Sequence, residues 1–475
     1  MMIFHYIFIG LEVVLLFNLL IGVHELGHFL AAKWRGLKID RFAIWFGKPI
    51  WKTKVNGVEY ALGWIPAGGY VALPQMATME AIEGKSDVPA AQLPNVSPLD
   101  KIIVAIAGPI FSFLLAIFFA FIVWGVGRPS NEANNSTTIG WVDPNGPAAK
   151  AGLLPGDTIL SIDGFSVKTF QPTASISDSV KWRIITSTGP TIAIKYIRDG
   201  KIATAYAVPT NVPTSWYERK SLRQLFIDYA SSATISQIVS NSPADRAGLK
   251  EGDQIIALNG EKIYSYDSID YAQMIMSNGP VKPLTLTVVR GKETFDKTLV
   301  PEKPLSPTNS TPMLGIMAWQ EDTNFSLVHP TPLDQIKESV GQIFATIGAI
   351  TQPKSQVGVQ QLGGAVMIVR VYSNLFQDED GWRRVLWFSV ILNVNLAILN
   401  MLPLPVLDGG HILLSFIEVI RRRPVSAKIL NSIQTGFAML LIGFMLYIAF
   451  FDTGDWLRSA RAGREQPIVF SPDAK

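Results

Sequence analysis

Four long apolar runs with few charged residues interrupt this chain. They cover about residues 7–32, 102–126, 385–407 and 429–451. Each run supplies roughly 20 residues, which is the length that an α-helix needs to cross the hydrocarbon core of a bilayer. The pattern therefore predicts four membrane-spanning helices separated by more polar segments.

The distribution of Lys and Arg predicts how these helices are oriented. No Lys or Arg precedes the first run, five follow it within residues 33–48, and three arginines at residues 421–423 separate the third and fourth runs. Because basic loops stay in the cytoplasm, both of these loops are expected there, with the termini and the middle region on the opposite side. Arg383, Arg384 and the arginines of the tail do not follow this rule.

The segment between the first two runs has the pattern of a β-hairpin. WKTKVNGVEYALGW carries Asn56-Gly57, the favoured two-residue turn, between two β-prone runs. IPAGGYVAL follows, and its paired glycines permit close approach of another backbone. Residues 35–100 are therefore expected to form a cytoplasmic loop with a membrane-associated β-hairpin.

An internal repeat with an offset of 96 residues occupies the middle of the chain. GPAAKAGLLPGDTILSIDG at residues 146–164 is matched by SPADRAGLKEGDQIIALNG at residues 242–260. Matching positions without a slip indicate two copies of one module. Each copy is expected to contain a short helix, a Gly-Asp turn, a strand and a hairpin, and we place the copies at residues 128–220 and 221–305.

The expected fold class is a multi-domain membrane protein, with an α-helical four-span core and two mixed α+β modules inserted between the second and third spans. An amphipathic pattern also predicts a helix over residues 332–351. The remaining boundaries are 1–34 for the first span, 101–127 for the second, 306–383 for a linker with the amphipathic helix, 384–424 for the third span and a cytoplasmic loop, 425–451 for the fourth, and 452–475 for the tail.

Composition agrees with a chain that is partly embedded in a membrane. Of 475 residues, 48% are hydrophobic and only 17% are charged. The net charge of +3 gives no reason to expect nucleic acid as a partner. The chain has no cysteine, which excludes disulfides, thiol nucleophiles and cysteine-bound metals.

A metal-binding pattern lies inside the first apolar run. His24-Glu25-Leu26-Gly27-His28 is an HExxH sequence, and on a helix its two imidazoles face the same side. Neutral imidazoles suit Zn²⁺, and Glu25 can take a proton from the attacking water. A chance match is the alternative, but ionisable residues deep in an apolar span are costly and are usually functional.

A catalytic zinc usually needs a third protein ligand, and the candidate lies far along the chain. Asp408 is an acid in an otherwise apolar segment, NMLPLPVLDGG, rich in helix breakers. The alternative is that Asp408 caps a helix at the membrane surface. His411 is close in sequence and is expected to support the site, while Asn395 and Asn400 serve either interhelical hydrogen bonding or the substrate.

Together, HELGH in the first span, NxxPxPxLDG in the third and an inserted pair of repeats resemble the site-2 protease family of intramembrane metalloproteases, in which the insertions are PDZ domains. The resemblance implies that His24, His28 and Asp408 bind one Zn²⁺ per chain and that Glu25 activates water. It also leads us to expect Asn where this chain has Ser112.

The resemblance extends to substrate contacts. An unwound substrate would pair as an added strand with a free edge of the hairpin-like loop, at either residues 60–64 or residues 70–73. The residues that the resemblance assigns to substrate are Gly68, Gly69, Tyr70, Val71, Asn395, Asn400, Pro403 and Pro405.

Tandem PDZ domains in a four-span chain resemble, more narrowly, bacterial members of the family that act in envelope stress responses. The implied substrates are single-span membrane proteins of the anti-sigma factor type, and signal-peptide remnants. The implied location is the bacterial inner membrane, in contact with lipid, with the PDZ domains periplasmic and the active site near the cytoplasmic side. These domains would either exclude large substrates or bind a peptide of the substrate or of a partner. A membrane-anchored PDZ scaffold with an inactive metal site and a transporter are the competing functions.

Overall fold

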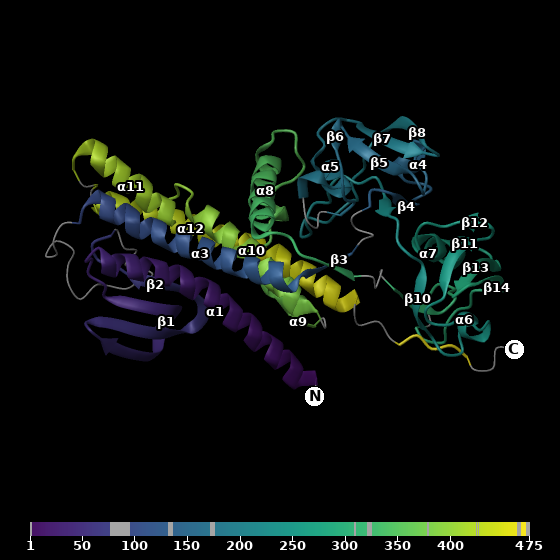
Figure 1. The fold of residues 1–475 in the computed structure, drawn as a ribbon, viewed down its shortest axis with the longest axis horizontal. Coiled ribbons are helices and arrows are strands. Elements are labelled where there is room, and N and C mark those ends of the chain that lie inside the picture. Colours follow the sequence, from purple (N-terminus) through teal and green to yellow (C-terminus); the bar gives the residue numbers. More distant parts are fainter. Residues whose placement is uncertain are drawn as a thin grey trace. The chain divides into compact units, whose positions relative to one another are not determined.

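The computed structural model describes residues 2–76, 96–131, 136–171, 176–307, 310–320, 325–377, 380–423, 425, 427–462 and 467–471. The chain divides into two compact units (Figure 1). The helical unit comprises Met1–Arg128, Val328–Ile343 and Gly363–Thr453. The β-rich unit comprises Pro129–Leu327, Phe344–Leu362 and Gly454–Lys475.

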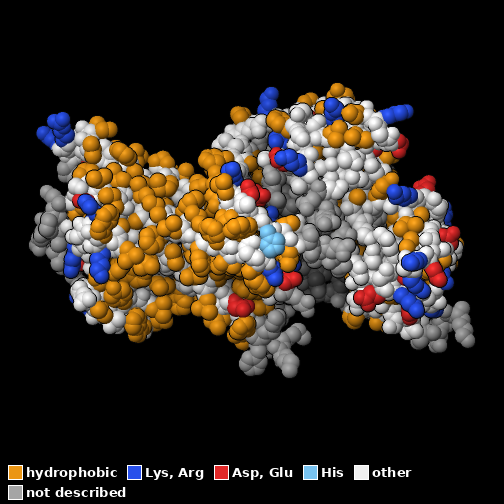
Figure 2. Space-filling model, viewed as in Figure 1, with side chains coloured by type: hydrophobic (Ala, Val, Ile, Leu, Met, Phe, Trp, Pro, Cys, Tyr) orange, Lys and Arg blue, Asp and Glu red, His pale blue; other side chains and the backbone are white. Residues whose placement is uncertain are grey.

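Four described helices are long and apolar enough to cross a membrane, as the sequence predicted. They are α1 (Met2–Trp34), α3 (Pro98–Val126), α10 (Gly381–Asn400) and α12 (Ala427–Ala462). Hydrophobic side chains dominate the visible face of the helical unit (Figure 2). Helix α3 packs against α1 and α10, and its completely buried Ala116 and Ala120 allow the helices to approach closely.

The third span ends earlier than its apolar run. Helix α10 ends at Asn400, an irregular segment follows, and α11 begins at Asp408 and runs to Arg421. Pro403 and Pro405 cannot continue a helix, which explains the break. A Cβ on Gly409 or Gly410 would lie only 2.3 or 2.1 Å from a carbonyl oxygen of the irregular segment, so these glycines let that segment fold back over α11.

The predicted hairpin is confirmed. Strands β1 (Arg41–Val55) and β2 (Val58–Ala72) are joined by Asn56-Gly57, and both turn residues have positive φ, 50° and 83°. Both long strands bend, so residues 41–44 pair with 59–62 on one side and with 69–72 on the other. Residues 60–62 also pair with 51–53, so both of their sides are occupied, whereas 69–72 form an outer edge of the described hairpin.

The β-rich unit contains two modules of the same build. In the first, one sheet has the order β6-β5-β7-β8 and a second pairs β4 with β9. In the second, the main path of the sheet is β14-β13-β11-β10-β15, and β12 pairs with β11.

The first module has helices α4 (Pro147–Lys150) and α5 (Val180–Thr186), and strands β4 (Ile139–Val142), β5 (Thr158–Ile162), β6 (Phe165–Ser166), β7 (Ile192–Arg198), β8 (Lys201–Ala207) and β9 (Ile227–Tyr229). The second has α6 (Pro243–Arg246) and α7 (Asp267–Met274), and strands β10 (Thr234–Ile238), β11 (Gln254–Leu258), β12 (Glu261–Lys262), β13 (Leu284–Arg290), β14 (Glu293–Leu299) and β15 (Ile316–Gln320).

The same ion pair, between a buried aspartate and a partly exposed arginine, explains the repeated Gly-Asp in both modules. Arg198 contacts Asp157 at 2.6 Å, and Arg290 contacts Asp253 at 2.6 Å. Each arginine also donates to a glycine carbonyl just before the turn, 2.7 Å away at Gly152 and 2.8 Å away at Gly248. Each aspartate therefore ties its turn to a distant strand.

The last strand of each module, β9 or β15, lies outside the repeated sequence motif. Strand β9 pairs with β4, and β15 pairs with β10, so the sheets extend past the boundaries at 220 and 305 that the repeat suggested. The remaining elements are strands β3 (Arg128–Asn131) and β16 (Phe325–Val328), which pair with each other, and helices α8 (Pro332–Thr351) and α9 (Ala365–Gln377). Helix α8 has the bounds that the amphipathic pattern predicted.

Candidate active site

Two imidazoles of α1 meet inside the helical unit. His24 and His28 lie one helical turn apart and both are buried. Their Nε2 atoms are 3.3 Å from each other. The pair therefore presents two nitrogen donors to one point.

Asp408 reaches the same point from the first turn of α11. Its carboxylate oxygens lie 3.2 Å from Nε2 of His24 and 3.3 Å from Nε2 of His28. In a tetrahedral site with Zn–N bonds of about 2.0–2.1 Å, neighbouring ligand atoms are about 3.3 Å apart. The spacing of this donor set thus fits Zn²⁺. Among the described residues, Oδ2 of Asp408 is buried without a hydrogen-bond partner, as expected for an oxygen that a cation would satisfy.

The far sides of both imidazoles are held by α3. Nδ1 of His28 donates to the backbone carbonyl of Val104 at 2.8 Å, and Nδ1 of His24 lies 3.0 Å from Oγ of Ser112. A carbonyl can only accept, so the proton of neutral His28 sits on Nδ1 and leaves the lone pair of Nε2 for a metal. Gly108 makes this approach possible, because a Cβ there would lie 2.2 Å from Nε2 of His28.

Sequence reasoning did not assign these supporting contacts. Ser112 stood out only because the resemblance leads to an expectation of Asn, and the carbonyl of Val104 carries no side-chain signal. The one signal in the sequence was Gly108-Pro109 inside an apolar span, because a glycine in such a span indicates that another helix packs closely against it.

Glu25 lies beside the imidazoles and faces the hairpin. The Glu25 side chain lines one cavity together with Val71 of the outer edge. Gly69 is packed against the same side chain, since a Cβ there would lie 3.2 Å from Cγ of Glu25. The edge strand of the hairpin is thus adjacent to the candidate general base.

The donors and Glu25 open into one cavity of about 340 Å³ within the helical unit. Asn400 lines it, and Nδ2 of Asn400 lies 3.4 Å from Nε2 of His24. His411 lines it too. The other lining residues are Ile21, Phe46, Gly69, Tyr70, Val71, Leu73, Met76, Val104, Ala105, Leu396, Val406, Leu407 and Gln434.

Half of the candidate substrate residues lie elsewhere. Gly68, Asn395, Pro403 and Pro405 are not among the residues that line the cavity. Gly68 has a φ of +74° and abuts the ring of Phe46, so packing alone explains a glycine there. The two prolines shape the irregular segment that precedes Asp408.

Comparison with known proteins places this site in a family. The family model of Peptidase family M50 matches residues 12–443. The chain belongs to peptidase family M50. This family is zinc-dependent, and the protein is accordingly a multi-pass membrane metalloprotease of regulated intramembrane proteolysis.

Relatives from Gram-negative bacteria are similar along almost their whole length. A chain of Haemophilus influenzae named regulator of sigma E protease is 29% identical over 91% of this chain and 96% of its own. The regulator of sigma-E protease RseP of Salmonella typhimurium is 27% identical over 90% and 95%, respectively. A relative in Vibrio cholerae that is named as a zinc metalloprotease is 29% identical over 87% and 91%.

Proposed function

We propose that this protease cuts single-span membrane proteins of the anti-sigma factor type, within or near their transmembrane segments. The observation that carries the proposal is the meeting of His24, His28, Asp408 and Glu25 in one cavity of the helical unit. The relatives named as regulators of sigma E protease support this type of substrate. Signal-peptide remnants are a second substrate class with the same chemistry.

In this proposal His24, His28 and Asp408 hold the zinc, and Glu25 moves the proton. Bound there, zinc would polarise the scissile carbonyl and make water a stronger acid. Glu25 accepts a proton from the attacking water and returns it to the leaving amide nitrogen. Glu25 lies close to Gly69, so its carboxyl group is adjacent to the segment where the substrate would bind.

The substrate is held in extended form along residues 69–72. A transmembrane helix hides its carbonyls in its own hydrogen bonds, so the segment to be cut must first unwind. The outer edge of the hairpin then supplies backbone donors and acceptors to the unwound segment, directly beside Glu25. Asn400, which lines the same cavity, would also hold the segment.

The two modules are proposed to be PDZ domains on the periplasmic side of the inner membrane, with the catalytic site near the cytoplasmic face. Size exclusion of substrates is one role. Peptide binding is the other, and a cavity of about 750 Å³ in the β-rich unit, lined mostly by the first module, supports it. Ile184 and Ile185 of α5 and Ile227 of β9 line this cavity, so a peptide could add to β9.

The proposal is tested with the purified chain in proteoliposomes and a labelled single-span substrate. We expect cleavage within the span. A zinc chelator should abolish this cleavage, and added zinc should restore it. A zinc-bound chain that cuts none of a panel of such spans would favour the scaffold alternative, and solute uptake by the same vesicles would favour the transporter.

A further inference from the structure

Two aromatic side chains project from a closed turn of the first module. The turn spans Ser215 to Glu218, and the amide of Glu218 donates to the carbonyl of Ser215 at 3.0 Å. The amide of Ser215 donates to the carboxylate of Glu218 at 2.9 Å. Trp216 at the tip is 87% exposed and Tyr217 is 47% exposed. The turn therefore holds two large apolar surfaces away from the module.

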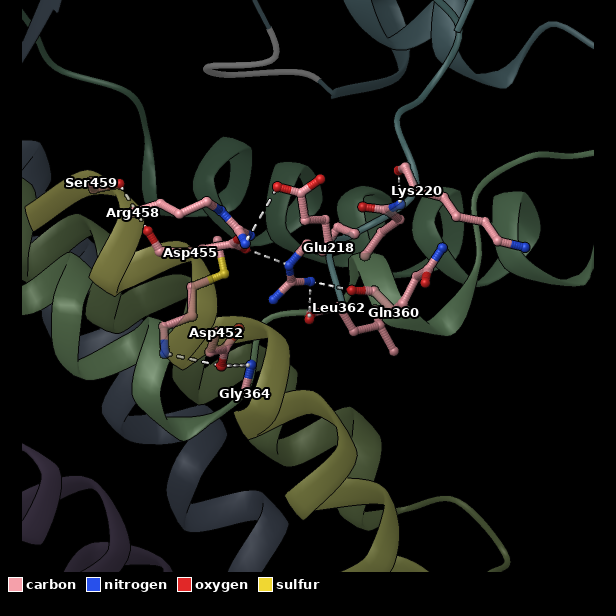
Figure 3. Close-up of polar contacts among 12 residues, drawn as sticks. Glu218, Lys220, Gln360, Leu362, Gly364, Asp452, Asp455, Arg458 and Ser459 are labelled. Carbon is pink, nitrogen blue, oxygen red and sulfur yellow. Dashed lines mark hydrogen bonds and ion pairs between the residues drawn. The ribbon is translucent and has the colours of Figure 1, made fainter. Parts of the chain in front are cut away.

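Salt bridges attach this turn to the end of α12. Nε of Arg219 lies 2.6 Å from Asp455, and Arg458 contacts both Asp455 at 2.5 Å and Glu218 at 3.7 Å. Arg219 also donates to the carbonyl of Leu362 at 3.0 Å. Figure 3 shows Asp455 and Arg458 on α12 directed toward Glu218. All of these residues belong to the β-rich unit.

The position of Asp455 on α12 sets the height of the turn relative to a bilayer. The apolar run of α12 ends at Phe451, and Asp455 is four residues farther along, or about 6 Å at 1.5 Å per residue. The headgroup layer on each side of a bilayer is roughly 5–8 Å thick. Trp456 and Leu457 are 52% and 50% exposed, as expected for interfacial residues. With the edge of the hydrocarbon core at Phe451, Asp455 lies within the headgroup layer.

The turn must lie near the same layer. Trp216 is three residues before Arg219, and three residues of chain span at most about 11 Å. Indole and phenol rings are favoured at the membrane interface, where their apolar faces leave water while their polar atoms stay hydrated. Lys220, next to Arg219 and exposed, adds a basic side chain that can attract lipid phosphates.

We propose that Trp216 and Tyr217 insert into the interface of the bilayer at which α12 ends, and so anchor the first module to lipid. The partner is the bilayer that the helices already span, and the turn extends the interfacial surface of α12. The anchor does not depend on the zinc chemistry or on the identity of the substrate.

The absence of cysteine allows a direct test on the full chain. Trp216→Cys and Tyr217→Cys are each labelled with a fluorophore in proteoliposomes, so one aromatic always remains. Lys292→Cys, in the exposed turn between β13 and β14, is the matched control. Labels at 216 and 217 should be quenched several-fold more by nitroxide-bearing lipids than the label at 292, and less by aqueous iodide.

Two outcomes would overturn the proposal. Labels at 216 and 217 that respond to iodide like the control would show a turn in water. Labels shielded from both quenchers would show a turn covered by protein. As a check without labels, Trp216→Ser with Tyr217→Ser should speed hydrogen exchange of residues 213–218 in proteoliposomes, whereas Trp216→Phe with Tyr217→Phe should not. Equal exchange in both variants would also contradict lipid anchoring.

Discussion

At the residue scale, the candidate metal site depends on one carboxylate that is distant in sequence from both imidazoles. Asp408→Ala is expected to lose zinc and cleavage together, since only two protein ligands would remain. Zinc content of the purified variant, measured beside its activity, checks this. If the variant keeps one zinc per chain, the third ligand is elsewhere, and His411 in the same cavity is the next candidate.

Ser112 is expected to tune the site without binding metal. Ser112→Ala removes the partner of Nδ1 of His24 and should weaken zinc binding about 10- to 100-fold. Ser112→Asn keeps a hydrogen-bonding group and should retain most of the affinity. Competition with a chelator of known affinity gives the measurement, and equal affinity for Ala and Ser would argue against this role.

The metal-binding residues could be identified from the sequence, but the contacts that hold the two imidazoles in place could not. His24, Glu25 and His28 share one short motif, and Asp408 is conspicuous as an acid in an apolar segment. The contacts of the imidazoles with α3 join residues 76 and 88 positions apart. Such contacts follow from how α1 and α3 pack, and no local pattern encodes them.

At the element scale, the edge of β2 carries the proposal for substrate binding. Val71→Pro removes a backbone N–H donor from the segment 69–72 that forms the outer edge, and should slow cleavage roughly fivefold to tenfold, consistent with about 1 kcal/mol for a hydrogen bond. Val71→Ala keeps the donor and is the matched control. Cleavage rates are measured with a substrate series that differs only within the span.

The same substrate series tests unwinding. Gly costs about 1 kcal/mol and Pro about 3 kcal/mol in a helix interior, so either residue near the cut should speed cleavage. The substrate does not add as a strand if cleavage rates are independent of substrate helicity and the Val71→Pro variant cleaves at the wild-type rate.

The sequence predicted secondary-structure elements well where a turn has a distinctive pair of residues. Asn56-Gly57 fixed the hairpin, because both residues tolerate positive φ. Apolar content alone did not place the end of α10, since the irregular segment after Asn400 is as apolar as the helix. The bend of β1 and β2 that makes 69–72 an edge was not predicted, because both flanking runs are β-prone throughout.

At the scale of the whole molecule, two of the arginines that disagree with the charge rule have local partners. Arg383 donates to the carbonyl of Val126 at the end of α3, and Arg458 pairs with Asp455. The two loops that follow the rule carry eight Lys and Arg residues. The proposed orientation therefore rests on the loops at 33–48 and 421–423.

Removing both modules tests their role as a filter. A chain in which a flexible linker replaces residues 139–320 keeps the helical unit and should cut substrates with bulky periplasmic domains that the intact enzyme refuses. Activity on a substrate without such a domain is the control for folding. Loss of all cleavage in a stably folded, zinc-bound deletion would instead favour peptide binding by the modules.

The most direct test of zinc-dependent intramembrane cleavage is a paired measurement on Glu25→Gln in proteoliposomes. The amide keeps the shape of the side chain but cannot accept the proton of the attacking water. One zinc per chain, as in the wild type, with cleavage of a single-span substrate lowered by about 1,000-fold or more, is the predicted result. A zinc-loaded Glu25→Gln chain that cuts the substrate at the wild-type rate would contradict the central claim.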